Sequence, residues 1–447
     1  MFKIKKDLMN LKRLILYVSL IFIFLILFNK IISIFLNFEN FINLNELFIN
    51  YEGGFLRRGL FGQIAFFLFS NFNINPITFF SILFSLANFI FFILYILCIQ
   101  KFKNNFFLYL ILIFSPATLM FSIFDSVNFF NNQIFLLISI LLHVYLATKY
   151  KKRIKIYKNF LYFLIIPFLF LSILQYDPQI LTLSVHFYIT YFISSKNKIY
   201  SKNIYYPYLI LLIPIFLIIL NNGSVEQVIA LENMKNIVRE NYDFIISKHP
   251  ESFSMIETND LGGNLNLKLG ALIKIFGIYF GYQQKKYIIL SILLSIVIFI
   301  LIAIYFVEKK IYLLPTKFFT IFLFILPIFS LFIFITDYGR TIHIFLLHIL
   351  AIFFLFEINN KKKLLEKKKS LFKESLIIIF LFIYCNFWTL SHAAGWVTIF
   401  NPNQPKYSVY SSYFNEIKKI SFNAYYFTDK FIIELPKAEF MMPYLNK

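Results

Sequence analysis

Long apolar stretches separated by short polar turns run through the whole 447-residue chain. Each stretch is about 20 residues long, which matches the hydrocarbon thickness of a bilayer. In lipid such a stretch must be a helix, because only a helix pairs all of its own backbone groups. The pattern predicts an all-α, polytopic integral membrane protein with about eleven transmembrane helices, near residues 14–36, 76–100, 105–123, 133–149, 159–175, 179–195, 206–221, 287–306, 317–336, 341–358 and 374–392.

The composition agrees with this class, since 60% of the residues are apolar and the mean hydropathy is +0.74. A soluble domain has too little polar surface to cover so much apolar material. Phe (63) and Tyr (29) are abundant, and we interpret most of them as lipid-facing side chains without a specific role. Cys98 and Cys385 both fall in apolar segments and predict no disulfide framework.

The Lys and Arg residues predict the orientation. With the N-terminus inside, the inner loops hold 26 basic and five acidic residues, whereas the outer side holds 16 basic and 17 acidic residues. This asymmetry follows the positive-inside rule and predicts a cytoplasmic N-terminus and an extracytoplasmic C-terminus. The net charge of +21 therefore needs no nucleic-acid partner. We expect a multi-pass protein of the bacterial inner (cytoplasmic) membrane, with membrane lipids around it.

One membrane domain, residues 1–447, is the simplest organisation, because no repeat and no long soluble segment is evident. The basic N-terminal residues precede a long apolar run without a small-residue cleavage site, so we expect a retained first helix. Three outer segments are sizeable: 37–75, 222–286 and 393–447. Within them, 55–72 and 266–282 predict interfacial or re-entrant helices, the second because Lys268 and Lys274 interrupt it.

The first outer segment holds the densest polar cluster, over residues 52–62 (EGGFLRRGLFG). Gly53 and Gly54 suit a tight turn into a helix, whose first N–H groups favour anions. Arg57 and Arg58 add two guanidinium groups, whose geometry suits phosphate. The arginines alone would equally suit a helix anchored at lipid head groups. The flanking glycines favour a binding site, and Glu52 is our first candidate for a general base.

Other outer turns add further candidates. Asp125 and Asp177 each lie in a short turn between two spans and are the second choice for the base, although both turns also fit plain connectors. The remaining candidates lie where the ninth span meets the tenth: Asp337, Tyr338, Arg340 and His343, with Asp337 orienting Arg340. Asp337 and Arg340 could form a structural ion pair, or they could bind a phosphate-bearing lipid.

These groups gather at one depth, beneath the outer head groups, whereas the bilayer midplane is poor in polar residues. Ion-coupled transporters keep charged residues and broken helices at the midplane, so the pattern favours an outer-leaflet site. We interpret His143, His186 and His348 as isolated packing residues. No set of His, Cys and Asp has metal-site spacing, which leaves the cofactor unknown and a divalent metal undecided.

The segment 52–62 resembles the GGF-(V/I)-RRGL-x-G segment of a family of bacterial multi-pass proteins associated with surface-polysaccharide loci. Residues 115–117 (SPA) and 337–340 (DYGR) are similar to two other family motifs, the second often being DWGR. The chain departs from the family at 131–133 (NNQ), where relatives tend to have RKE, and at 176–177 (YD), where they tend to have HE. The general plan is also similar to that of GT-C glycosyltransferases, by analogy of fold.

The resemblance implies a role in envelope-glycan biosynthesis. We expect GT-C-like transfer of a sugar from a polyprenyl-phosphate donor to a glycan acceptor on the extracytoplasmic face. Arg57, Arg58 and Arg340 would bind the donor phosphate, and Glu52 would deprotonate the acceptor. Two alternatives stay open: a repeat-unit polymerase or ligase of the same pathway, and a lipid-linked glycan flippase or non-enzymatic assembly subunit.

Overall fold

The computed structural model describes residues 14–29, 31, 47–102, 105–124, 131–197, 202–221, 224–241, 285–308, 315–331, 338–356, 379–380 and 384. Every regular element in these ranges is a helix, as the apolar pattern predicted. Residues 14–29 form the first helix. The labelled elements are α3 (Leu60–Phe72), α4 (Pro76–Ile99), η2 (Gln100–Phe102), α5 (Phe106–Phe114), α6 (Leu119–Phe124), α8 (Gln133–Lys149), α9 (Ile154–Phe160), η3 (Leu161–Ile165), α10 (Ile166–Gln175), α11 (Gln179–Lys196), η4 (Lys202–Ile204), η5 (Tyr206–Leu211), α12 (Leu212–Leu220), α13 (Val225–Asn241), α16 (Lys285–Glu308), α17 (Pro315–Phe329) and α19 (Tyr338–Leu355).

Local sequence sets several helix ends. The Asn75 side chain accepts a hydrogen bond from the Ile77 N–H at 2.8 Å, and Pro76 stands at the first helical position of α4, where a missing N–H costs nothing. Asn73 ends α3 in the left-handed conformation (φ 52°), which asparagine tolerates better than most residues. These signals separate the short α3 from the long α4.

Two continuous helices are long and apolar enough to cross a membrane, Pro76–Phe102 and Ile154–Gln175. A third span results if the bent pair Tyr206–Leu220 and Val225–Asn236, which meet at 98°, is counted as one. Other apolar helices are shorter, among them Gln133–Lys149 and Gly339–Leu355. The structure therefore agrees with a membrane protein and with α3 as the helix expected over 55–72. The segment 266–282 and the tail 393–447 lie outside the described residues.

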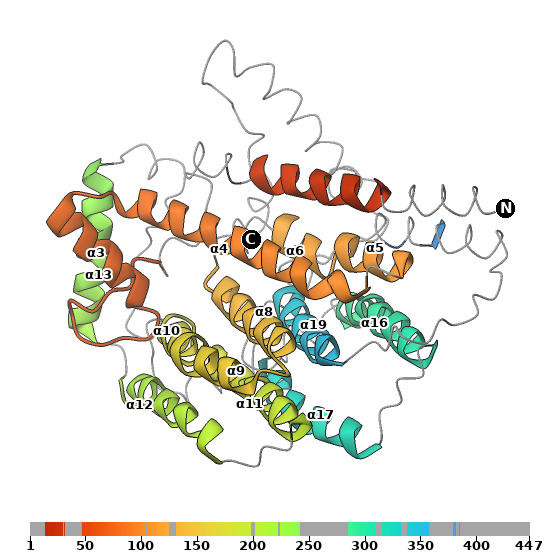
Figure 1. Ribbon diagram of the computed structural model, residues 1–447. Helices are drawn as coiled ribbons and strands as arrows, with labels where there is room; N and C mark the ends of the chain where they lie inside the picture. Colours follow the sequence, from red (N-terminus) through yellow and green to blue (C-terminus); the bar gives the residue numbers. More distant parts are fainter. Residues whose placement is uncertain are drawn as a thin grey trace, which may run out of the picture.

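The bundle is built around α8. This helix lies between α4 and α11 (Figure 1), and it also packs against α19 and α10. Most of its side chains are buried on all sides, polar ones included. The surrounding core is aliphatic and aromatic, and Ile, Leu and Phe on lipid-side positions stay exposed. An apolar exterior around an apolar core is what a helix bundle in lipid requires.

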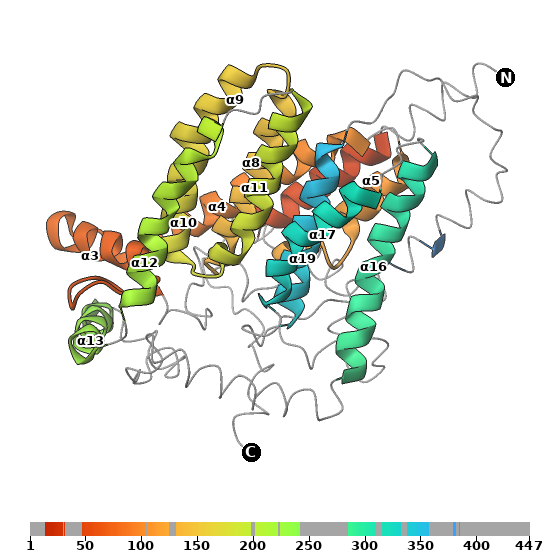
Figure 2. The ribbon, with the colours of Figure 1, turned by 90° about the horizontal axis from the view of Figure 1, so that it is seen from below.

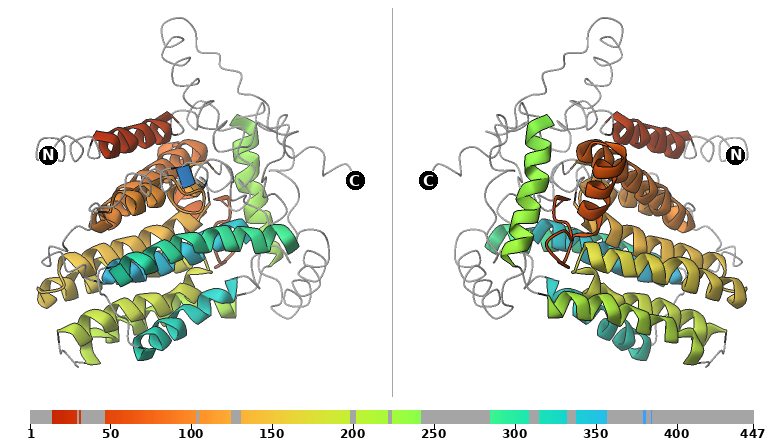
Figure 3. Two further views of the ribbon diagram at one scale, coloured as in Figure 1. Left: turned by 90° about the vertical axis from the view of Figure 1, so that its right-hand side faces the viewer. Right: turned by 90° about the vertical axis from the view of Figure 1, so that its left-hand side faces the viewer.

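The helix ends gather at two ends of the bundle (Figure 2). One end, here named the site end, carries α3, α13, the start of α19, and the turn between α10 and α11. The opposite end, named the basic end, carries the turn between α8 and α9. That turn lies in the segment 149–158, which contains six Lys and Arg residues. Helix α13 runs crosswise to the bundle helices at the site end (Figure 3).

Candidate functional site

The loop before α3 is held by close contacts that only glycine permits. A Cβ atom on Gly62 would overlap the carbonyl oxygen of Ile49, and one on Gly59 would overlap the Tyr51 ring. A Cβ atom on Gly53 would overlap the backbone of Glu226 in α13. Gly53 and Gly62 let the loop lie directly against α13 and α3, and the predicted anion-binding role of Gly53 and Gly54 stays a prediction. Gly54 has φ +109°, where a side chain would be strained.

Helix α13 fixes the outer side of this loop. The Gln227 side chain donates from Nε2 to the Phe55 carbonyl at 2.8 Å, and the Asn50 side chain donates to the Ala230 carbonyl at 3.3 Å. Ile49, Leu56 and Leu231 form a small buried apolar cluster under these bonds. Helix α13, the described start of the outer segment 222–286, therefore lies directly against this loop.

Arg57 and Arg58 both bind Asp177, and we name these three residues the arginine clamp. Arg57 donates from a terminal guanidinium nitrogen to Oδ2 at 3.1 Å, and Arg58 donates from Nε to Oδ1 at 2.8 Å. The side chains keep 24%, 20% and 22% of their surface exposed, respectively. Two guanidinium groups and one carboxylate give these three side chains a formal charge of +1 between them. They are partly exposed, and guanidinium groups suit an anion.

The backbone of Arg58 helps to hold the clamp together. Arg58 has φ 66°, in the left-handed region, which is uncommon outside glycine and asparagine. In this conformation its N–H donates to the Leu174 carbonyl at the end of α10, at 2.9 Å. The guanidinium group also lies over the Tyr176 ring, 5.8 Å from its centre. Such a strained conformation persists only where surrounding contacts enforce it, and it often accompanies a functional site.

The same pairing sets the charge state of Asp177. Burial alone would raise the pKa of its carboxyl group, but the neighbouring guanidinium groups of Arg58 and Arg57 outweigh burial and lower the pKa to about 2. The carboxylate therefore stays ionised at neutral pH and is a weak base. Geometry and charge give Asp177 the role of positioning the two arginines. Its predicted role as a base has no support from this geometry.

Glu52 lies on the same loop as Arg57 and Arg58, and it is exposed. One carboxylate oxygen accepts a hydrogen bond from Gln63 Nε2 at 2.6 Å, while Gln63 Oε1 accepts the Tyr51 N–H at 2.7 Å. Gln63 thus ties the carboxylate to the first turn of α3. The sequence pattern did not single out Gln63. Its polar side chain directly follows the RRGLFG segment and falls in a largely apolar helix, and this position could have indicated a role for it.

Buried amide groups lie under the loop. Gln175 is fully buried and accepts the Phe61 N–H at 2.9 Å, and the Phe61 ring packs against Phe135 of α8 at 4.7 Å. Asn132 and Gln133 at the start of α8 are also buried, and no described residue hydrogen-bonds either side-chain amide. Buried polar groups require partners, so these amides mark a place for water or a polar ligand.

A second group of predicted residues lies at the start of α19. His343 is buried and donates from Nδ1 to the Ala117 carbonyl at 2.9 Å, so its Nε2 accepts the Ser122 hydroxyl at 2.9 Å. Tyr338 begins α19, and Arg340 is half-buried in its first turn. Asp125 and Asp337 lie outside the described residues, so the expected Asp337–Arg340 pair stays a prediction.

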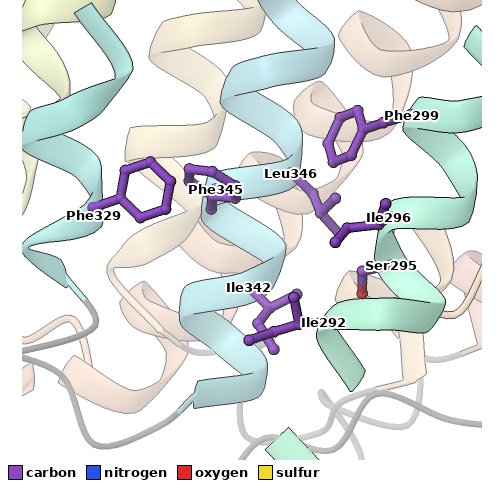
Figure 4. A pocket seen from close by; sticks show the side chains of 8 residues that line it. All are labelled: Ile292, Ser295, Ile296, Phe299, Phe329, Ile342, Phe345 and Leu346. Carbon is purple, nitrogen blue, oxygen red and sulfur yellow. The ribbon is translucent and has the colours of Figure 1, made fainter. Parts of the chain in front are cut away.

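An apolar cavity of about 210 Å³ opens beside this second group, between α16, α17 and α19 (Figure 4). It begins close to the site end, where Ile342 lies two residues after Arg340. Its lining is apolar apart from the Ser295 hydroxyl: Ile292, Ser295, Ile296, Phe299, Phe329, Ile342, Phe345 and Leu346. Such a lining suits a hydrocarbon chain, and apart from that hydroxyl it has no hydrogen-bonding group for a polar head group.

The structure therefore brings together Glu52, Gly53, Gly54, Arg57, Arg58 and Asp177, from two turns that are 120 residues apart. Arg340 and His343 belong to the second group at the same end. The prediction of isolated histidines was wrong for His143 and His186, because their rings share a hydrogen bond (2.9 Å between the Nδ1 atoms). Among the described residues, no three His, Cys, Asp or Glu side chains form a metal site.

No protein-family model, curated protein or solved structure matches this chain.

Proposed function

We propose that this protein transfers a sugar from a polyprenyl-phosphate donor to a glycan acceptor, on the extracytoplasmic side of a bacterial inner membrane. The observation that carries the proposal is the arginine clamp. It is a cationic, partly exposed group that a carboxylate and a strained backbone hold in place at one end of an apolar bundle. Guanidinium groups in this setting suit a phosphate on a membrane lipid.

The proposal includes the eleven-span topology, with the N-terminus inside and the C-terminus outside. It is supported by the position of the basic turn 149–158, at the end of the bundle opposite to the clamp (Figure 2). Under the positive-inside rule the basic end faces the cytoplasm, and the site end then faces outward. Helices α5 and α8 are short, and we expect each to cross the membrane together with the turn that follows it in the sequence.

In this reaction the clamp holds the donor phosphate and stabilises the charge that develops on it. The bond between the anomeric carbon and the phosphate oxygen breaks, and polyprenyl phosphate leaves with the bonding electrons. Preorganised cationic groups at the leaving oxygen lower the barrier because they need no reorganisation during the reaction. Asp177 prevents the two guanidinium groups from repelling each other before the donor binds.

Glu52 takes the proton of the acceptor hydroxyl as the new glycosidic bond forms. Its carboxylate is exposed on the loop that carries Arg57 and Arg58, and Gln63 orients it through the 2.6 Å hydrogen bond. A general base must be held within hydrogen-bond reach of the attacking hydroxyl, and a tethered carboxylate meets that condition. Asp125, in a turn outside the described residues, is the second candidate for this role.

The apolar cavity supports a lipid-linked substrate. Its lining of Ile, Phe and Leu suits part of an isoprenoid chain, and Arg340 stands two residues from its end at Ile342. We assign Arg340 to the same phosphate-binding role as Arg57 and Arg58. A repeat-unit polymerase is the second candidate, because α13 packs directly on the loop that carries Glu52, where a long acceptor chain would enter.

A deletion strain complemented with point variants tests the assignment of residues. Glu52→Gln should abolish rescue of the surface glycan, while a tagged protein still accumulates in the membrane at the wild-type level. Glu226→Gln is the matched control, since Glu226 is also an exposed carboxylate, in the adjoining helix α13, and it should rescue fully. Near-normal rescue by Glu52→Gln would remove Glu52 from the base role.

A further inference from the structure

A stripe of polar side chains follows one face of α11, in the middle of the bundle. Gln179, Thr182, His186 and Thr190 recur at helical spacing, and each is fully buried. Helix α8 presents a matching stripe, with Asn132, Ser139 and His143 at intervals of seven and four residues. We name the two facing stripes, together with Tyr157 and Tyr208, the polar seam.

The seam is joined by short hydrogen bonds over most of its length. Ser139 Oγ lies 3.4 Å from Gln179 Oε1 and 3.3 Å from His186 Nε2. His186 Nδ1 lies 2.9 Å from His143 Nδ1, and His143 Nε2 lies 2.8 Å from the Tyr157 hydroxyl. From there the bonds continue to Thr190 (3.2 Å) and to the Tyr208 hydroxyl (2.8 Å).

One arrangement of protons satisfies the bonds from Tyr208 to Ser139. In it the Tyr208 hydroxyl donates to Thr190 instead of to the His186 carbonyl, which lies 3.1 Å away, and the contact between Ser139 and Gln179 Oε1 carries no proton. His143 carries its proton on Nδ1 and donates it to His186 Nδ1, while His143 Nε2 accepts from the Tyr157 hydroxyl. His186 then carries its proton on Nε2 and donates it to Ser139 Oγ, whose own proton goes to the Leu136 carbonyl at 2.7 Å. From Tyr208 to Ser139 every donor in this arrangement points from the basic end towards the site end, and the Leu136 carbonyl accepts the last proton. A continuous line of O–H and N–H groups is an arrangement that passes protons.

Both ends of the seam approach the ends of the bundle. Gln179 to Thr190 covers about 16 Å of α11, at about 1.5 Å per residue. Tyr208 lies near the start of η5, close to the basic end, and the neighbouring Tyr205 is partly exposed. At the site end the buried Asn132 and Gln133 amides have no described hydrogen-bond partner, and water there would extend the line to the surface.

We propose that the polar seam is a proton pathway through the bundle. A proton enters near Tyr208 and passes through Thr190 and Tyr157 to His143 Nε2, while His143 releases its Nδ1 proton to His186. His186 in turn releases its Nε2 proton to Ser139, and water beside Gln179 and Asn132 carries the charge outward. Only O–H and N–H bonds form and break, and each passage leaves the proton count of the seam unchanged. The inference does not depend on the proposed transferase activity.

A third buried histidine provides an internal control. His348 on α19 is also fully buried, but its Nδ1 bonds the carbonyl of its own helix at Ile344 (2.7 Å) instead of a seam residue. Replacing this imidazole by phenylalanine should therefore leave the line of bonds intact, although it makes the same change to a buried side chain as His143→Phe does.

Proteoliposomes with an internal pH dye and a valinomycin-set potassium potential test the pathway. The wild-type protein should acidify or alkalinise the lumen, according to the sign of the potential, faster than protein-free vesicles do. Tyr157→Phe and Thr190→Val remove only a hydroxyl group and should lower the flux at least tenfold, as should His143→Phe. His348→Phe should keep the wild-type flux.

Two results would overturn the proposal. One is a wild-type flux no greater than that of protein-free vesicles, in a preparation that a protonophore still equilibrates. The other is a flux that Tyr157→Phe and Thr190→Val leave unchanged, because the protons would then follow another route. These two variants keep the shape of the side chain, so the test remains decisive even where His143→Phe fails to fold.

Discussion

Asp177→Asn is the substitution that separates the arginine clamp from ordinary loop packing most cleanly. The change keeps the shape of the side chain and removes the charge that pairs with Arg57 and Arg58. The pKa of Asp177 lies at about 2 instead of 3.8, and at about 1.4 kcal/mol per unit this corresponds to about 2 kcal/mol of stabilisation. Because the side chain keeps 22% of its surface exposed, we take this figure as an upper value.

Hydrogen–deuterium exchange measures that loss where it occurs. The Arg58 N–H bonds the Leu174 carbonyl and the Phe61 N–H bonds the Gln175 side chain, both at 2.9 Å, so a peptide covering 57–63 reports the junction of α3 and α10. About 2 kcal/mol corresponds to opening that is up to about 30-fold more frequent. We expect faster exchange in this peptide alone.

The control for this experiment is Glu226→Gln, which changes an exposed carboxylate to an amide on the neighbouring helix α13. It should leave exchange over 57–63 at the wild-type rate. Exchange within twofold of wild type in Asp177→Asn would refute the reasoning, because the ion pairs would then contribute nothing to holding the two turns together.

Three further predictions follow from the same geometry. Hydrogen–deuterium exchange over 57–63, corrected for the intrinsic rate, should be equal at pH 5 and pH 8. The lowered pKa of Asp177 gives stability that is lost only as the pH falls through about 2. Faster exchange at pH 5 than at pH 8 would contradict the pairing of Asp177 with the arginines. Gly62→Ala should sharply lower the yield of folded protein on size-exclusion chromatography, because its Cβ would overlap the Ile49 carbonyl; a normal, monodisperse yield would show that the loop can move away. Gln63→Leu should reduce rescue of the surface glycan in complemented cells while membrane insertion stays normal, since Glu52 loses its tether; full rescue would make the 2.6 Å bond incidental.

The sequence predicted the helical, apolar class of the structure better than the lateral arrangement of its helices, and the depth of the site in a membrane stays a prediction. Lipid forces apolar stretches into helices and confines charged groups to their ends, so the polar turns at 52–62 and 175–179 were expected at one depth. Which helices are neighbours is decided by packing, which hydropathy does not encode. For this reason the sequence suggested Asp177 as a base, whereas the structure shows its carboxylate bound to two arginines.

The buried histidines illustrate the same limit. The spacing of Gln179, Thr182, His186 and Thr190 is visible in the sequence as one helical face. Without knowing that α8 lies opposite α11, however, that face cannot be matched to Ser139 and His143. Each histidine taken alone looked like a packing residue, and only the bundle reveals them as members of one hydrogen-bonded line.

The most direct test of the central claim is mass spectrometry of the lipid-linked glycan intermediates in a strain that lacks this protein. We predict intermediates shortened by one sugar, with the complete intermediate restored by the wild-type gene and not by Glu52→Gln. Complete but unpolymerised repeat units would contradict the transferase and favour the polymerase, and an unchanged pool of intermediates would contradict both.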